Sequence, residues 1–320
     1  MAGMNLILPA ALPLPPVVHH PAYCAELPEE HRFPMNKFRR VAELALAEGL
    51  VPGGKFLKPR AAPAEWVALA HDPAYVEQVF STNVPPAIAR EIGFPMTQSI
   101  ALRGRCATGG SVLTGYLALE HGLACNTAGG SHHARKAHGA GFCVFNDVAV
   151  AIRVMQADGV IRRALVVDLD VHQGDGTADI FAGDPSVFTF SMHAQKNYPV
   201  RKVPSDLDLG LEDGLMDAPY LDLLAEHLPQ VIDRAEPDIV FYNAGVDPFA
   251  GDKLGRLALS HEGLRLRDEH VIRTVRHLGL PLAGVLGGGY STDIDELAGR
   301  HLTLLRAAAA VARETPVLSA

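Results

Sequence analysis

A hydrophilic segment that directly follows an apolar run carries the residues best suited to metal chemistry. Residues 164–167 (ALVV) predict a buried strand, and DLDVHQGDG follows at positions 168–176. Side chains two positions apart share one face of a strand, so Asp168, Asp170 and His172 are expected to leave the strand end in the same direction. Three such groups on a buried strand are costly unless something neutralises and coordinates them, and a divalent metal does so.

A third metal ligand must come from elsewhere in the chain. A catalytic zinc takes three protein ligands and leaves one position for water, and Asp170 and His172 supply two of them. We expect Asp247 to be the third, because it follows the predicted strand 238–243 and two small residues that let the backbone turn tightly. The alternative for Asp247 is a surface turn, since a proline comes next.

Two adjacent histidines follow a Gly-Gly turn and are suited to proton transfer. His132 and His133 could form a metal site, a polar loop or an acid–base pair, and the nearby metal residues favour the acid–base pair. A carboxylate behind each ring would fix its tautomer, and Asp168 and Asp175 are the free candidates. Asp175 could instead cap a turn, because it stands between two glycines.

A tyrosine follows three consecutive glycines near the end of the chain. The phenol of Tyr290 could donate a hydrogen bond to an oxyanion that develops on a substrate carbonyl, and the alternative is a half-buried aromatic residue. The glycines at 287–289 do not form a dinucleotide-binding fingerprint, because they lack its spacing and its later acidic residue.

The elements that position these residues alternate between strands and helices. Apolar runs predict strands at 122–127, 164–170, 187–190, 238–243 and 281–286, and helical spacing predicts helices at 147–158, 220–235, 261–277 and 297–313. Such alternation predicts an α/β fold with a mostly parallel sheet and helices on both faces. The unusual residues all follow strands, so they should meet at the carboxyl edge of the sheet in one active site. We therefore expect one domain over 1–320, with a core at about 19–310.

Composition excludes several classes of protein. A formal charge of −8 over 320 residues argues against nucleic acid as a partner. The four cysteines are scattered, which indicates neither disulfides nor a structural zinc site and favours a cytoplasmic location. Residues 1–20 are apolar but broken by prolines and lack a basic start, so they are a poor signal peptide, and no apolar run is long enough to span a membrane. The oligomeric state is not predicted.

Taken together, these residues resemble the zinc-dependent histone deacetylase family, with the arginase/deacetylase fold, over roughly residues 19–300. The motifs that carry the resemblance are GSHHA (130–134), GAGFC (139–143), DLDVHQGDGT (168–177), NAGVD (243–247) and GGGY (287–290). Two stretches, HRFPMNK (31–37) and GDKLGRL (251–257), are similar to the class IV branch and its bacterial relatives. The sequence AGGS at 128–131 departs from the Pro-Pro-Gly triplet usual in classes I and II, which puts the substrate pocket in doubt.

The resemblance implies a sheet of about eight strands and a role for each motif residue. It implies zinc on Asp170, His172 and Asp247, the pairs His132–Asp168 and His133–Asp175, and Tyr290 on the substrate carbonyl. It places Gly141, Phe142, Tyr198, Leu254 and Gly288 along an acyl-lysine channel. It also implies a structural potassium ion held by main-chain oxygens of Asp168, Asp170, His172 and Met192 with the Ser191 hydroxyl, and part of a second monovalent site at Phe181, Asp184 and Val187.

The activity that follows is hydrolysis of N-acyl-lysine side chains in proteins or peptides, with acetyl or longer acyl groups. One alternative on the same fold is an amidohydrolase acting on acetylpolyamines or other small N-acyl amines. An arginase-like binuclear manganese enzyme would need a D-x-H-x-D run, and position 174 is a glycine. A catalytically silent scaffold or acyl-lysine reader would be expected to lack a metal ligand or Tyr290, and neither is missing.

Overall fold

A seven-stranded, fully parallel sheet forms the centre of the protein in the computed structural model, which describes residues 14–314. The strand order is β1-β2-β7-β6-β3-β4-β5. The strands are β1 (Val17–Val18), β2 (Leu123–Asn126), β3 (Ala164–Asp168), β4 (Val187–Ala194), β5 (Leu207–Leu211), β6 (Ile239–Asn243) and β7 (Leu282–Val285). The predicted parallel α/β sheet is confirmed, and its strand number is close to the expected eight.

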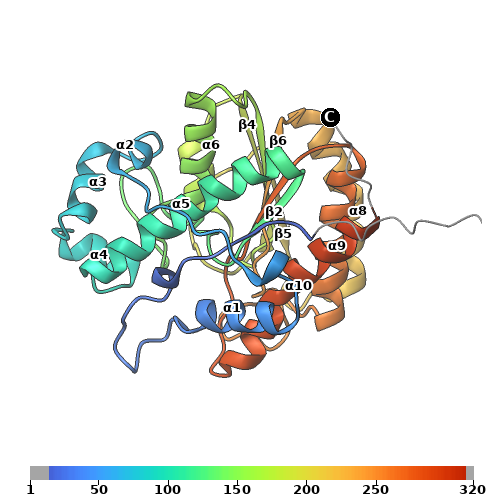
Figure 1. The fold of residues 1–320 in the computed structure, drawn as a ribbon, viewed down its shortest axis with the longest axis horizontal. Helices are drawn as coiled ribbons and strands as arrows, with labels where there is room; N and C mark the ends of the chain where they lie inside the picture. The colour runs from blue at the N-terminus through green and yellow to red at the C-terminus, as the bar shows by residue number, and fades with distance from the viewer. Residues whose placement is uncertain (1–13, 315–320) are drawn as a thin grey trace, which may run out of the picture.

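Helices cover both faces of the sheet (Figure 1). The α-helices are α1 (Lys37–Ala47), α2 (Ala64–Val67), α3 (Pro73–Phe80), α4 (Pro86–Ile92), α5 (Gln98–His121), α6 (Asp147–Ala157), α7 (Asp175–Phe181), α8 (Asp217–Ala235), α9 (His261–His277) and α10 (Ile294–Glu314). Two short 3₁₀ helices, η1 (Pro21–Tyr23) and η2 (Pro52–Gly54), lie in the N-terminal third. In Figure 1, α5 and α6 lie on one side of the sheet and α8, α9 and α10 on the other.

The alternation of side chains along the central strands divides the interior into two hydrophobic cores. Val166 of β3 and Phe241 of β6 pack with α5 and α6, whereas Leu165 and Val240, one position earlier, pack with α8, α9, α10 and α1. The strands are buried on both faces and therefore consist of continuous apolar runs. This burial fixes the register, because a slip by one residue would exchange the two faces.

The carboxyl ends of the strands point to one edge of the sheet, as parallel pairing requires. Asp168 at the end of β3 is in register with Ser191 of β4 on one side and Asn243 of β6 on the other. The loops after β2, β3, β6 and β7 therefore start side by side. Within residues 14–314, no helix is both long and apolar enough to cross a membrane. The predicted core at 19–310 lies inside this range, whereas most of the stretch assessed as a signal peptide, residues 1–13, lies outside it.

Candidate active site

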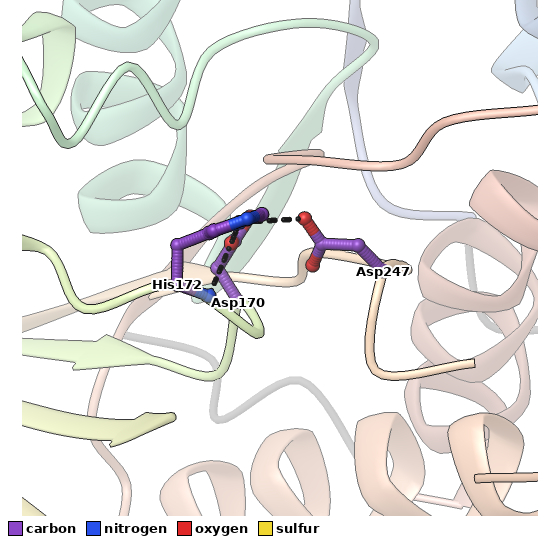
Figure 2. A group of neighbouring side chains, drawn as sticks. All are labelled: Asp170, His172 and Asp247. Atoms are coloured by element: carbon purple, nitrogen blue, oxygen red, sulfur yellow. Dashed lines mark hydrogen bonds and ion pairs between the residues drawn. The ribbon is translucent and has the colours of Figure 1, made fainter. Parts of the chain in front are cut away.

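Asp170, His172 and Asp247 converge at the carboxyl edge of the sheet (Figure 2). Asp170 and His172 lie in the loop after β3, and Asp247 lies in the loop after β6. The Nδ1 atom of His172 is 3.0 Å from Oδ1 of Asp170 and 3.1 Å from Oδ2 of Asp247. One donor atom from each residue lies within 4.8 Å of the others, and all three side chains are buried. This is the geometry of a site for one metal ion with three protein ligands.

Two local features show that the donor set fits a metal ion. Oδ2 of Asp247 is buried, and its charged neighbour is the His172 ring, with Nδ1 at 3.1 Å, whereas Oδ1 of the same group accepts a hydrogen bond from the backbone N–H of Val171 at 2.9 Å. A Cβ atom at Gly288 would fall 2.1 Å from Oδ2 of Asp247 and 2.5 Å from Oδ2 of Asp170, so only glycine leaves room for both carboxylates. Two buried carboxylates that share a single imidazole are costly unless a cation neutralises them.

The pKa values of the two carboxylates and the imidazole depend on one another. Burial lowers the pKa of His172, but its hydrogen bonds to Asp170 and Asp247 outweigh burial and raise that pKa to about 10. Burial raises the pKa of Asp247 to about 7, and the neighbouring charge of Asp170 adds to the effect. A divalent cation would replace the proton that these groups share, so metal binding is expected to release protons.

Contrary to the prediction from the sequence, Asp168 does not share one strand face with Asp170 and His172. Strand β3 ends at Asp168, so the alternation of faces does not continue to Asp170 and His172, which lie in the loop after the strand. The Asp168 carboxylate instead points to His132, with Oδ2 2.7 Å from Nδ1 of the ring. Its Oδ1 accepts hydrogen bonds from the Asn243 side chain at 2.9 Å and from the Asp170 backbone at 3.2 Å. Asp168 is thus a partner of a histidine and lies behind the metal ligands.

His132 and His133 have ring centroids 4.1 Å apart and each has a carboxylate partner. Nδ1 of His133 is 2.6 Å from Oδ1 of Asp175, whose other oxygen accepts a hydrogen bond from Arg135 at 2.7 Å. In both histidines the Nδ1–H faces the carboxylate, which leaves Nε2 for other partners. Nε2 of His132 lies 3.7 Å from Oδ1 of Asp170, beside the metal ligands.

The two histidines have opposite pKa shifts. Burial lowers the pKa of His132, but the charges of Asp168 and Asp170 outweigh burial and raise that pKa to about 9. Burial also lowers the pKa of His133, and here the charge of His132 adds to burial, so the value falls to about 4 despite Asp175. At neutral pH the pair therefore contains one imidazolium and one neutral imidazole, and the neutral ring of His133 can accept a proton.

The loop that carries the histidine pair is held by residues to which the sequence assigned no role. Asp147, the first residue of α6, is fully buried and accepts hydrogen bonds from the backbone N–H groups of Gly130 at 3.2 Å and Ser131 at 2.7 Å. Gly130 has a φ of +76°, and a Cβ there would meet the Asn243 side chain at 2.5 Å. The only sequence signal for Asp147 is its place at the start of a predicted helix, which suggests a cap and not a link to the site.

Tyr290 lies next to the metal residues, with its ring 6.4 Å from the His172 ring and 6.0 Å from the Phe142 ring. The Tyr290 side chain is buried, and burial raises the pKa of its phenol well above its ordinary value, so the hydroxyl stays protonated. Lys37 also lines this region: its ammonium group is buried and lies 5.6 Å from the centre of the Tyr290 ring. Lys37 stands in the motif at 31–37, but its chemistry there was not anticipated.

The predicted channel residues surround His133 and Tyr290. A Cβ at Gly141 would fall 2.6 Å from the His133 ring and 3.2 Å from the Tyr198 ring. Tyr198 stands edge-on to His133 at 4.8 Å and is 42% exposed, which suits a channel entrance. Phe142 adopts a φ of +66° and is held by a 2.7 Å hydrogen bond from its N–H to the Ile92 carbonyl.

Leu254 and Gly288 also border this region. The Leu254 carbonyl accepts a 2.7 Å hydrogen bond from the side chain of Asn197, the residue before Tyr198. Gly288 contributes to a cavity of about 30 Å³ with His132, His133, Phe142 and Tyr290.

The residues predicted to bind monovalent cations contact other protein groups. Asp168 and Ser191 are neighbours across β3 and β4, next to Met192, and the Ser191 hydroxyl is 2.9 Å from Nδ1 of His193. At the second predicted site, the Asp184 carbonyl accepts a hydrogen bond from Val187, and the Asp184 N–H donates to Phe181. The Asp184 carboxylate is paired with Arg153 at 2.7 Å. Binding of potassium at either place stays a prediction.

The chain is similar to known proteins over most of its length. The model of the histone deacetylase domain matches residues 31–305. The chain is 32% identical to histone deacetylase 2 of Arabidopsis thaliana, with 81% of this chain and 70% of that protein covered. It is 50% identical to an uncharacterized protein of Picosynechococcus sp., with 92% of this chain and 98% of that protein covered. The crystal structure of the HDA15 HD domain superimposes with a TM-score of 0.76 at 21% identity, covering 92% and 90% of the two chains, which supports the fold.

The chain is a hydrolase of the deacetylase type, built on a parallel α/β sheet with a candidate three-residue metal site at the carboxyl edge. The chain belongs to the histone deacetylase family.

Proposed function

We propose that this protein is a zinc-dependent hydrolase that removes acyl groups from N-acyl-lysine side chains of proteins or peptides. The observation that carries the proposal is the arrangement around one small cavity. Two carboxylate-paired histidines, a buried tyrosine and Asp170 line this cavity. His172 and Asp247 complete the candidate metal site beside Asp170. A zinc ion held by Asp170, His172 and Asp247 would polarise the acyl carbonyl and lower the pKa of a bound water.

The side chains divide the remaining work between them. The neutral His133 takes the proton of the attacking water at Nε2, while Asp175 orients the ring through Nδ1. His133 then gives that proton to the leaving amine. His132, charged and held by Asp168, stabilises negative charge that develops beside it. The Tyr290 hydroxyl, protonated at any physiological pH, donates a hydrogen bond to the substrate oxyanion.

The dimensions of the site favour a short acyl group. The cavity between Tyr290 and the histidines measures about 30 Å³, and a cavity needs only about 10–15 Å³ to hold one water, so this one has room for about two. An acetyl methyl group fits such a space, whereas an octanoyl or myristoyl chain requires side chains to move apart. We therefore propose acetyl-lysine as the preferred substrate within the class.

A panel of substrates and metals tests the proposal. Peptides with acetyl-, butyryl-, octanoyl- and myristoyl-lysine are compared with acetylputrescine, after chelator treatment and after restoration with zinc or manganese. The expected result is zinc-restored hydrolysis that is fastest on the acetyl peptide, with one metal ion per chain. Faster turnover of acetylputrescine would assign the protein to the small-amine amidohydrolases, and two manganese ions per chain would assign it to arginase-like chemistry.

A further inference from the structure

The backbone of residues 288–290 is held at nearly every polar atom, although three glycines precede the tyrosine. The Gly288 N–H donates to Oδ2 of Asp170 at 2.7 Å, and the Gly288 carbonyl accepts from Val246 at 3.0 Å. The Gly289 carbonyl accepts a 3.1 Å hydrogen bond from Nζ of Lys37. A chain with Gly289 at a φ of +144° has little intrinsic stiffness, so these contacts must fix the place of the tyrosine.

The tyrosine itself is held by the loop that follows the third metal ligand. The backbone N–H of Tyr290 donates to Oδ2 of Asp252 at 2.7 Å, and its carbonyl accepts from the N–H of Lys253 at 3.2 Å. Oδ1 of Asp252 accepts two further hydrogen bonds, from the N–H groups of Leu254 at 2.9 Å and Gly255 at 3.1 Å. One carboxylate thus joins its own turn to the tyrosine loop.

This turn also packs directly against the metal ligand Asp247. A Cβ at Gly255 would fall 1.9 Å from the Asp247 carbonyl oxygen, so the chain doubles back onto the ligand shortly after leaving it. Positive charge also lies near this loop: the buried guanidinium of Arg300 stacks on the Phe249 ring at 4.4 Å. Asp252 therefore links the loop that follows Asp247 to the loop that carries Tyr290, so a movement of the first loop would also displace the second.

We propose that Asp252 is a positioning residue that holds Tyr290 at its working distance from the metal site by fixing the Tyr290 backbone. The inference rests on the proposed role of Tyr290 as oxyanion donor. Oxyanion donors act only within a narrow distance range, and a misplacement of about 1 Å can cost about 100-fold in rate. Asp252, to which the sequence assigned no role, thereby gains a function.

Two substitutions separate the contact to Tyr290 from the local turn. In Asp252→Asn one oxygen remains, which can serve the turn or Tyr290 but not both, and the amide nitrogen would face an N–H group. In Asp252→Ser the hydroxyl can still accept from the turn but is too short to reach Tyr290. Each variant is expected to lose about 10- to 100-fold in kcat on the acetyl-lysine peptide, with KM changed less than about threefold and zinc content unchanged.

A double-mutant cycle and hydrogen exchange identify positioning as the cause. In a Tyr290→Phe background the same Asp252 substitutions should cost less than about threefold, because the hydroxyl to be positioned is already gone. Amide exchange of the segment 287–291 should accelerate at least about tenfold, while exchange of α10 stays unchanged. Asp238→Asn is the matched control: its Oδ2 accepts from the N–H groups of Arg162 and Arg163 at the opposite end of the sheet, and activity should stay at the parental level.

Each outcome supports or overturns the inference. Equal losses in the parental and Tyr290→Phe backgrounds, unchanged exchange at 287–291, or loss of zinc in the Asp252 variants would overturn it. If the parental protein hydrolyses none of the acyl amines yet exchange at 287–291 responds as described, the proposed function fails while the positioning of Tyr290 by Asp252 stands.

Discussion

Substitution of Gly288 by alanine is expected to abolish tight zinc binding without unfolding the protein. The new Cβ would lie 2.1 Å from Oδ2 of Asp247 and 2.5 Å from Oδ2 of Asp170, where ordinary contact begins at 3.4 Å. Each oxygen must therefore move by roughly 1 Å, whereas metal–ligand distances tolerate only about 0.2 Å. The φ of Gly288 is outside the left-handed region, so the alanine backbone is unstrained and the effect is steric.

The affinity loss follows from how firmly the two carboxylates are held. Asp247 cannot swing aside cheaply because its other oxygen accepts a hydrogen bond from Val171, and Asp170 accepts from His172 and from Gly288 itself. Disturbing groups that only support metal ligands costs about 10- to 100-fold in affinity, and here the ligands themselves are displaced. We therefore expect zinc affinity to fall at least about 100-fold, or about 2.8 kcal/mol.

Competition with a chromophoric chelator measures this affinity, and circular dichroism reports whether the fold is intact. Gly299→Ala is the matched control, because Gly299 lies in α10 and its added Cβ would meet no atom of another described segment within 4 Å. The control should bind zinc normally and unfold at higher temperature, since alanine stabilises a helix by about 0.5–1 kcal/mol relative to glycine. A folded Gly288→Ala protein with parental zinc affinity would refute the assignment of Asp170 and Asp247 as ligands of one metal ion.

The other predictions concern proton transfer and stability. Tyr290→Phe should lower kcat by about 10²- to 10³-fold while zinc content and melting temperature stay unchanged, and near-normal turnover would remove the oxyanion role. In steady-state assays at neutral pH, His133→Ala should lower kcat by up to about 10⁴-fold, and this loss should exceed that of His132→Ala. A larger loss in His132→Ala would exchange the roles of the two rings. Burial lowers the pKa of His71 from 6.5 to about 4, so the unfolded chain binds the extra proton, and stability should fall by roughly 3 kcal/mol as the pH falls from 6.5 towards 4. In His71→Gln, the free energy of unfolding measured with urea should depend less on pH between 6.5 and 4 than in the parental protein. An unchanged pH dependence would contradict this account.

Much of the fold could be predicted because the central strands have a simple environment. Runs such as 164–167 are buried on both faces and therefore apolar throughout, and the helices between them show clear spacing. Helix α9 spans His261–His277 as predicted, and α6 ends one residue before its predicted boundary. The strand ends then identify the site, because parallel strands bring their carboxyl ends to one edge.

In the N-terminal third and in the edge strand β5, the sequence shows no comparable apolar pattern. Helix α5 (Gln98–His121) is buried along most of its length and contains Gly109 and Gly110, so neither spacing nor propensity marks it as a helix. Those glycines are explained only by tertiary contacts: a Cβ at Gly109 would fall 1.9 Å from the Arg60 carbonyl, and one at Gly110 would fall 2.1 Å from the Tyr23 hydroxyl. Strand β5, at the edge of the sheet, is only partly buried, and its short run of residues includes an aspartate and a glycine.

Some residues of the candidate site could be predicted from the sequence, and others could not. Metal-type residues and the histidine pair are recognisable from their chemistry, since few other uses exist for such groups at strand ends. Asp147, Asn243 and Asp252 were not recognisable, because each acts by accepting or donating hydrogen bonds across large sequence separations. A carboxylate that binds a distant backbone N–H looks, in a sequence, like any other turn or helix-cap aspartate.

The segment 168–175 supplies two of the three candidate metal ligands and the carboxylate partners of both histidines. A shift of this stretch of backbone would therefore move Asp170 and His172 together with the carboxylates that orient the histidine rings. The same arrangement fixes the length of the segment: inserting or deleting one residue between Asp168 and Asp175 would move the carboxylate partners of the histidines relative to the candidate metal ligands. Variation among proteins built on this plan should therefore collect in the surrounding loops and spare the length of this segment.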